Sequence, residues 1–192
     1  MSFSRFVLFS AAVLIVANGV LVSALQNPPA PIDDAFIQKQ FGSTCSLIGM
    51  APFVADLDGD GIDDIAIPAK CTNPMMNMTE NGYAVIDPYN AFFGYGNPAI
   101  TTQFASEDPK RRGYSLLIIH GSGAEAWRAD IPKAKFLVVN LPFKDVSVKK
   151  LAFKKKVVMA IYVDESGGDA MMSALVWDGK KYRYQPMGST ME

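Results

Sequence analysis

Histidine and cysteine are scarce in this sequence. One histidine, His120, and two cysteines, Cys45 and Cys71, occur among 192 residues. A zinc site built on His120 alone would lack ligands, and the cysteines do not have the Cys-x-x-Cys spacing typical of a reactive thiol pair. An even pair of cysteines in a secreted chain is most simply a disulfide, so we expect Cys45 and Cys71 to be bonded to each other.

Long apolar runs are confined to the N-terminus. Arg5 precedes an unbroken stretch of small and apolar residues, Phe6–Val16, and Val22-Ser23-Ala24 has the small residues of a cleavage site. These features predict that residues 1–24 are a signal peptide and that the protein is extracytoplasmic, either periplasmic or secreted. An uncleaved anchor is the alternative, because Phe6–Leu25 is long enough to span a bilayer. After cleavage we expect no stable membrane span.

The rest of the chain has the length of one domain. Residues 25–32 are proline-rich and predict a linker, residues 33–188 a single globular domain, and residues 189–192 a frayed tail. Asp33 is a suitable cap for a helix over residues 34–41, and most later apolar segments have the length and turn signals of strands. This order predicts an α+β, β-rich fold with an antiparallel sheet and one or two short helices.

The charges are unevenly distributed along the chain. The net charge of the whole chain is −1, which gives no reason to expect a nucleic-acid partner. Residues 25–109 carry 11 acidic and 2 basic side chains, whereas residues 110–192 carry 8 acidic and 15 basic ones. The two parts can attract each other within one domain, and a bound cation would offset some of the acidic charge. The alternative is a basic surface for an anionic polymer. We expect the lysines at 154–156 to occupy a solvated turn or edge strand.

Five carboxylates and two glycines share the nine-residue stretch Asp56–Asp64. Like charges this close need compensation, and calcium supplies it by taking six to eight oxygen ligands in flexible geometry. Gly61 permits a sharp turn because it tolerates positive φ. Asp63 falls between ligand positions and is expected to face solvent or cap a backbone amide. The expected calcium ligands are the side chains of Asp56, Asp58, Asp60 and Asp64 and the backbone carbonyl of Ile62.

The segments that flank this stretch predict a strand–loop–strand calcium site. Pro52–Ala55 and Ile65–Pro68 have the composition of short buried strands, and the glutamate at the twelfth position of an EF-hand is replaced by Ile67. The whole segment Gly49–Pro68 resembles one FG-GAP or VCBS-type repeat, the calcium-loop unit of integrin α-subunit propellers and many secreted bacterial proteins. The resemblance implies calcium binding by Asp56, Asp58, Asp60 and Asp64. Only one such loop occurs, so propeller architecture is not implied.

Two other segments suggest function. Residues 87–104 mix Gly, Pro and Asn with aromatic residues and predict a long irregular loop. Its rings either form an exposed platform for a carbohydrate or peptide, or fold back over the core. The candidate platform residues are Tyr89, Phe92, Phe93 and Tyr95. His120–Trp127 looks like the oxyanion segment of an α/β-hydrolase, but Gly-x-Ser-x-Gly is missing and a triad would need a second histidine.

These features predict a calcium-binding domain that is not an enzyme, that uses calcium mainly as a structural ion, and that binds a protein or glycan partner. The alternative is a calcium-dependent hydrolase of glycans or esters, which needs two carboxylates that converge outside the metal site. The candidates for that pair are Asp87, Glu125, Asp164 and Glu165. A third hypothesis is an envelope protein whose basic C-terminal part binds an anionic polymer.

Overall fold

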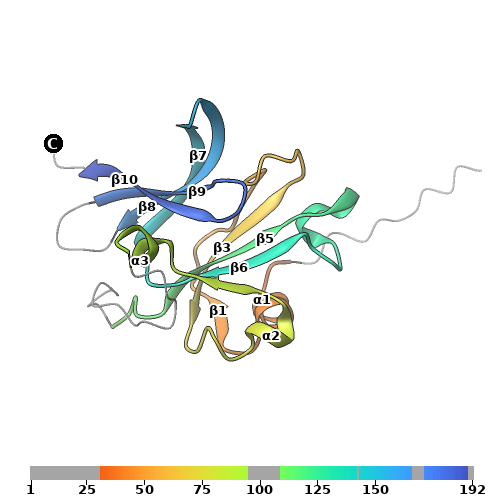
Figure 1. Ribbon diagram of the computed structural model, residues 1–192. Helices are drawn as coiled ribbons and strands as arrows, with labels where there is room; N and C mark the ends of the chain where they lie inside the picture. Colours follow the sequence, from red (N-terminus) through yellow and green to blue (C-terminus); the bar gives the residue numbers. More distant parts are fainter. Residues whose placement is uncertain (1–30, 95–108, 142, 166–170, 190–192) are drawn as a thin grey trace, which may run out of the picture. The chain divides into compact units, whose positions relative to one another are not determined.

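The computed structural model describes residues 31–94, 109–141, 143–165 and 171–189 (Figure 1). The strands in these ranges are β1 Cys45–Leu47, β2 Phe53–Ala55, β3 Asp64–Cys71, β4 Ala84–Ile86, β5 Tyr114–His120, β6 Ala134–Val138, β7 Phe143–Phe153, β8 Lys156–Glu165, β9 Met171–Trp177 and β10 Tyr182–Ser189. The helices are α1 Asp34–Phe41, α2 Met78–Asn81, α3 Pro88–Phe92 and the 3-10 helix η1 Gly123–Arg128. This composition confirms the predicted β-rich fold with antiparallel sheets and short helices.

Several predictions concern residues outside these ranges. The signal peptide, most of the linker and nearly all of the C-terminal tail fall there, as does Tyr95 of the candidate platform. They therefore stay predictions. Within the described ranges, no helix has the length and apolar character that crossing a bilayer requires.

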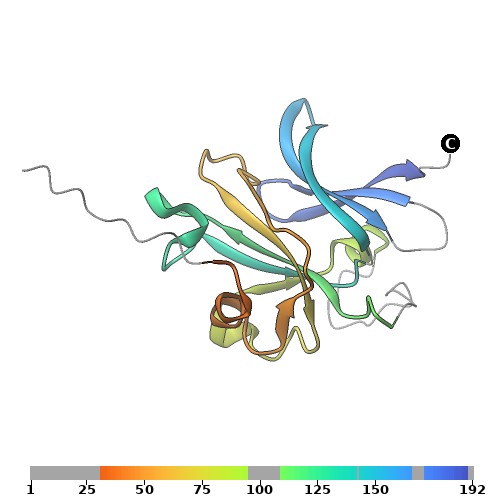
Figure 2. The ribbon, with the colours of Figure 1, turned by 180° about the vertical axis from the view of Figure 1, so that it is seen from behind.

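The described strands form two sheets. The first has the order β1-β3-β5-β6-β4, with β2 also paired to β3, and the second has the order β10-β9-β8-β7. Nearly every pair is antiparallel, but β4 and β6 run parallel. The second sheet is a meander of consecutive strands. Its strands are the ones drawn in blue in Figure 2.

Both faces of the first sheet are buried at its strands β3 and β5. On one face, Ile67 and Leu117 pack with Phe41 of α1, and on the other face Leu116 and Ile118 pack against the second sheet. A strand covered on both sides has no polar face, so it reads as a continuous apolar run rather than an alternating one. This explains why residues 116–119 read Leu-Leu-Ile-Ile.

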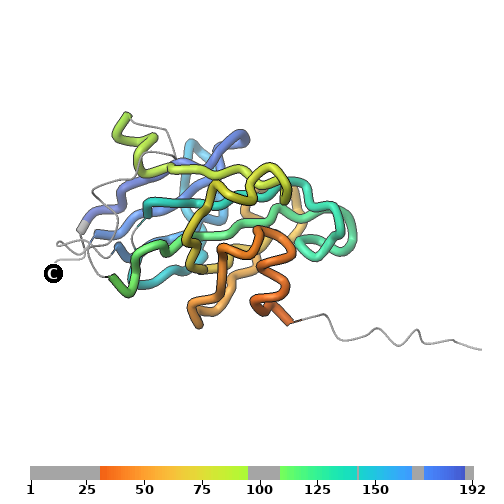
Figure 3. Tube along the Cα trace, turned by 90° about the horizontal axis from the view of Figure 1, so that it is seen from below, coloured from red at the N-terminus to blue at the C-terminus, as the bar shows by residue number. Residues whose placement is uncertain are grey.

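Helix α1 lies beside β1 (Figure 3) and has the ends that the sequence predicts. The side chain of Asp33 accepts a hydrogen bond from the N–H of Phe36 at 2.8 Å, which satisfies one of the free donors at the helix start. The helix ends at Gly42, whose φ of 90° is readily adopted only by glycine. Ile37 and Phe41 are fully buried and anchor the helix on the sheet.

Helix α3 corrects one prediction. The expectation of an irregular loop from residue 87 is wrong for Pro88–Phe92, which form a short helix. Asp87 caps it by accepting the N–H of Asn90 at 2.8 Å, and proline suits the first helical position because it has no N–H to satisfy. A helix of five residues is too short to produce a periodic apolar pattern, so the sequence did not reveal it.

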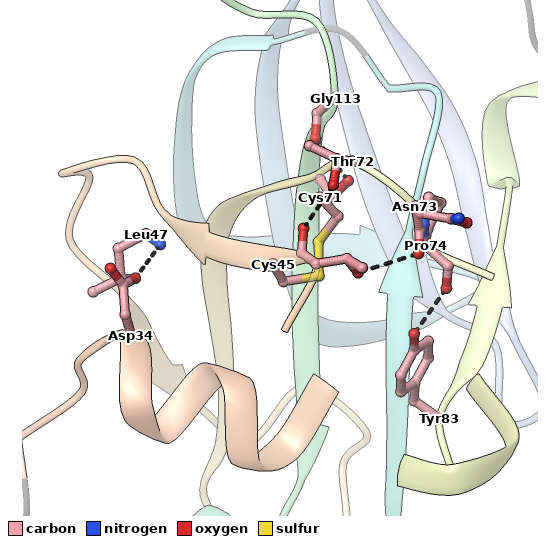
Figure 4. The surroundings of a disulfide bond; sticks show 11 residues. Asp34, Cys45, Leu47, Cys71, Thr72, Asn73, Pro74, Tyr83 and Gly113 are labelled. Atoms are coloured by element: carbon pink, nitrogen blue, oxygen red, sulfur yellow. Dashed lines mark hydrogen bonds between the residues drawn. A yellow bond between two sulfur atoms is a disulfide. The ribbon is translucent and has the colours of Figure 1, made fainter. Parts of the chain in front are cut away.

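The disulfide between Cys45 and Cys71 confirms the predicted pairing (Figure 4). The two cysteines are directly opposed in the β1–β3 ladder, with their Cα atoms 4.2 Å apart. Tertiary hydrogen bonds hold the same region: Asp34 accepts the N–H of Leu47 at 2.7 Å, and the hydroxyl of Tyr83 donates to the carbonyl of Pro74 at 2.8 Å. The disulfide thus closes the segment that carries the acidic loop.

We expect reduction of the Cys45–Cys71 disulfide to lower the free energy of unfolding by about 3 kcal/mol, because the bond restrains a loop with a sequence separation of 26 residues. Urea unfolding with and without reductant measures the difference. The Cys45→Ala/Cys71→Ala double variant should match the reduced wild type and should not respond to reductant. Equal stability of oxidised and reduced protein would contradict this expectation.

Candidate metal centre

The pairing of three strands places the acidic loop. Residues 56–63 form the turn of the β2–β3 hairpin, in which Ala55 pairs with Asp64. Strand β3 pairs with β5, and β5 pairs with β6 so that His120 lies opposite Ala134. The acidic turn, the end of β5 and the start of β6 therefore meet at one edge of the first sheet.

The loop is wound around the carboxylate of Asp56. Its two oxygens accept hydrogen bonds from the N–H groups of Gly59 at 2.7 Å, Asp60 at 3.1 Å and Gly61 at 2.9 Å. Gly59 and Gly61 have φ values of 80° and 86°, which other residues rarely adopt. Two more local bonds tighten the turn, from Asp60 N–H to Asp58 at 3.1 Å and from Ile62 N–H to Asp60 at 2.9 Å.

This winding gathers the predicted ligands. Carboxylate oxygens of Asp56, Asp58 and Asp60 all lie within 4.8 Å of one another. Ile62 is on the loop, and the expectation that its carbonyl faces an ion stays a prediction. Asp63 is exposed, as its place between ligand positions predicts.

Asp64 is the buried member of the set, with no exposed surface. One carboxylate oxygen accepts the N–H groups of Leu57 at 2.8 Å and Asp58 at 3.2 Å, and the other accepts the N–H of Gly121 at 2.8 Å. Burial raises the pKa of Asp64 to about 6, against the opposing effect of these hydrogen bonds. Asp64 therefore joins the acidic loop to the residue that follows β5.

Lys133 supplies positive charge to the loop, and sequence reasoning did not identify it. Its ammonium group donates to carboxylate oxygens of Asp58 and Asp60, both at 2.6 Å. These hydrogen bonds hold the pKa of Lys133 above its usual range and lower that of Asp60. The side chain of Lys133 is 48% exposed, whereas that of Asp58 is 2% exposed, so only the lysine is free to swing into solvent.

His120 also belongs to this centre. Its Nδ1 atom lies 3.4 Å from a carboxylate oxygen of Asp58, and its Nε2 atom lies 2.7 Å from the hydroxyl of Tyr182. Burial lowers the pKa of His120, which favours the neutral ring. Burial also raises the pKa of Tyr182, which keeps its proton and can donate it to Nε2. With Tyr182 as the donor, the ring proton is on Nδ1 and faces Asp58, so a metal ion at Nδ1 would have to displace that proton.

Aromatic rings from both sheets enclose His120. Its ring centroid is 4.8 Å from that of Trp177 and 5.1 Å from that of Phe136. Asp58, Asp64 and His120 offer ligand atoms within 4.8 Å of one another. The structure thus places two carboxylates beside His120 that sequence reasoning did not locate, while the expectation that His120 forms no zinc site stays a prediction. The signal that could have located them is the pairing of β3 with β5, because its register continues to Asp64 opposite His120.

The candidate platform is divided between core and surface. Phe92 and Phe93 are about half exposed and their ring centroids are 5.0 Å apart. Tyr89 is buried, and its ring lies 4.9 Å from that of Tyr184 on β10. Tyr89 therefore folds back over the core, whereas Phe92 and Phe93 form an exposed apolar surface.

The carboxylates considered for a hydrolase are distributed over the start of α3, η1 and β8, and two of them are adjacent on β8. Asp87 caps α3 and accepts a hydrogen bond from the side chain of Asn140 at 2.7 Å, while burial raises its pKa. Glu165 ends β8 and accepts the hydroxyl of Tyr184 at 2.6 Å. Glu125 is exposed on η1, and Asp164 lies beside Glu165 on β8. Both buried carboxylates are thus engaged with neutral partners.

Comparison of the chain with protein-family models, with curated proteins and with solved structures found no match. The resemblance of Gly49–Pro68 to an FG-GAP or VCBS-type loop therefore stays a prediction. The interpretation of the centre rests on the chemistry of its own residues.

We expect Asp64→Asn to lower the free energy of unfolding by about 1–3 kcal/mol even in the presence of a chelator, because an asparagine NH₂ would face the backbone donors of Leu57 or Gly121. Asp63→Asn makes the same chemical change at the exposed neighbouring position and should stay within about 0.5 kcal/mol of wild type. Urea unfolding in EDTA compares the two. Equal effects at both positions would show that the buried carboxylate does not hold the loop.

Proposed function

We propose that this protein is an extracytoplasmic calcium-binding domain without catalytic activity, in which the ion closes the β2–β3 loop. The observation that carries the proposal is the gathering of Asp56, Asp58 and Asp60 within 4.8 Å of one another. Carboxylates at that separation repel, and a divalent cation among them converts the repulsion into attraction.

The donors favour calcium. They are carboxylate oxygens on a loop of successive tight turns, and hard cations prefer oxygen. Calcium accepts irregular, flexible coordination more readily than magnesium, which demands near-octahedral geometry. His120 lies beside this set, and an imidazole nitrogen is a better ligand for zinc than for calcium. Comparing zinc with calcium therefore tests which metal ion the site prefers.

The disulfide supports an extracytoplasmic location. Such bonds persist in oxidising compartments and are rare in the cytosol of most organisms. The predicted signal peptide at residues 1–24 supports the same compartment. The resemblance of the loop to FG-GAP and VCBS-type units, which occur in secreted and cell-surface proteins, adds further support.

A structural role for the ion follows from the position of the loop. It lies between Cys45 and Cys71 in sequence and joins β2 to β3, a central strand of the first sheet. An ion that binds there stabilises the same segment as the disulfide. The exposed pair Phe92 and Phe93 is the surface we propose for a protein or glycan partner, because aromatic rings offer large, rigid contact areas.

Calcium should raise the melting temperature by roughly 5–10 °C at a concentration about 100 times the dissociation constant, because binding to the folded state alone adds nearly 3 kcal/mol there. Differential scanning calorimetry with calcium, with zinc and with EDTA measures the effect. Asp56→Asn/Asp58→Asn should remove the calcium response, and Asp63→Asn should keep it. Identical melting temperatures with calcium and EDTA for the wild type would contradict calcium binding.

Lys133→Gln should increase calcium affinity about fivefold, because the ion must displace the lysine ammonium from Asp58 and Asp60. Isothermal titration calorimetry measures the affinity, and Lys39→Gln, an equal charge change at an exposed site on α1, is the control. Failure of both wild type and Lys133→Gln to bind calcium would mean that Lys133 is the permanent counter-ion of a loop without metal.

A further inference from the structure

The β7–β8 hairpin carries a concentration of positive charge that the calcium centre does not use. The strands pair from Phe143 with Glu165 out to Phe153 with Lys156. Among the described residues, β8 pairs with β9 only over Ile161–Asp164, so the end of the hairpin extends past the neighbouring strand (Figure 1). We call residues 149–157 the hairpin end.

The hairpin end is basic without local compensation. Its five lysines are all exposed, and the sequence from Val146 to Val163 contains no acidic residue. The lysines are Lys149, Lys150, Lys154, Lys155 and Lys156. Described ion pairs elsewhere involve Lys133, Arg183 and His120. At the hairpin end, Lys149 and Lys154 lie over the rings of Tyr162 and Phe153, which leaves their charge uncompensated. The charge of the hairpin end is therefore available to an external partner.

The turn itself is unfavourable for lysine. Lys154 and Lys155 have φ values of 46° and 68°, so the turn has positive φ at both central positions. Such two-residue hairpin turns are dominated by Asn-Gly and related pairs, because a Cβ atom disfavours positive φ. The backbone therefore gives no reason for two lysines here, and what they contribute is charge.

An apolar side chain projects among these lysines. Val157 is 68% exposed and pairs with Ala152, which is exposed as well. Cross-strand partners point to the same face of a hairpin, as do residues two apart on one strand. Val157, Ala152 and Lys150 thus form one face, in which apolar groups lie beside positive charge.

We propose that the hairpin end is a peripheral binding site for an anionic phospholipid surface. Clustered lysines are attracted to anionic headgroups, and an exposed apolar side chain beside them can enter the boundary with the acyl chains. A soluble anionic polymer would be attracted by the charge but would gain nothing from Val157. The proposal is independent of calcium and rests on the hairpin alone.

Binding of the full chain to vesicles tests this site. The chain should partition more strongly into vesicles that contain phosphatidylglycerol with phosphatidylcholine than into vesicles of phosphatidylcholine alone. The vesicles of phosphatidylcholine alone measure the binding that does not depend on charge. Added salt should weaken the difference. Lys154→Asn/Lys155→Gly removes two charges and installs the preferred turn pair, so it should keep the fold and reduce charge-dependent partitioning roughly 30-fold.

The matched control is Lys180→Gln/Lys181→Gln, an equal charge change at the exposed β9–β10 turn, which should leave partitioning near the wild-type value. Val157→Ser should weaken vesicle binding but not binding to polyglutamate. Equal partitioning into neutral and anionic vesicles, or equal losses in the two double variants, would overturn the site. Unchanged vesicle binding by Val157→Ser would overturn the lipid assignment and favour a soluble polyanion.

Discussion

The buried carboxylate of Asp64 is the constraint on which the candidate centre depends. It accepts N–H groups from Leu57 and Asp58 on its own loop and from Gly121 after β5. A carboxylate without solvent must be hydrogen-bonded, and these donors come from two chain segments far apart in sequence. The loop is therefore held against the sheet before any ion binds. The carboxylates of Asp56, Asp58 and Asp60 still lie close together, and their mutual repulsion favours a positive charge among them.

Within the protein, Lys133 supplies positive charge to the loop, and the proposed calcium ion would supply it from solution. Lys133 immediately precedes β6, and its backbone N–H donates to the carbonyl of His120, so its side chain starts close to the loop. The flexible side chain of Lys133 neutralises Asp58 and Asp60 with a small desolvation penalty, because about half of that side chain stays exposed to solvent. A calcium ion brings twice the charge and binds more oxygens. If calcium binds as proposed, the ion would replace Lys133 as the neutralising charge, and Lys133 would set how much free energy the ion must contribute.

The sequence predicted the parts of this fold whose signals are local. The cap at Asp33 and the apolar run of β5 depend on neighbouring residues, and so does the winding of Asp56–Asp64. It could not predict His120 as a member of the centre, because that depends on the register between β3 and β5 and on Tyr182 from the second sheet. Helix α3 was missed for a different reason: its five residues are held by one cap and by packing on β10, and neither produces a periodic pattern.

The uneven charge of the chain now has two explanations, which apply to different lysines. The attraction between acidic and basic parts that the sequence suggests is realised at Lys133, whose ammonium group lies against the acidic loop. It is not realised at the hairpin end, where Lys154 and Lys155 occupy a turn that disfavours them and are exposed to solvent. Internal compensation would place a lysine near a carboxylate rather than at the far end of a hairpin. The proposed partner outside the chain accounts for the charge at the hairpin end, independently of the acidic loop.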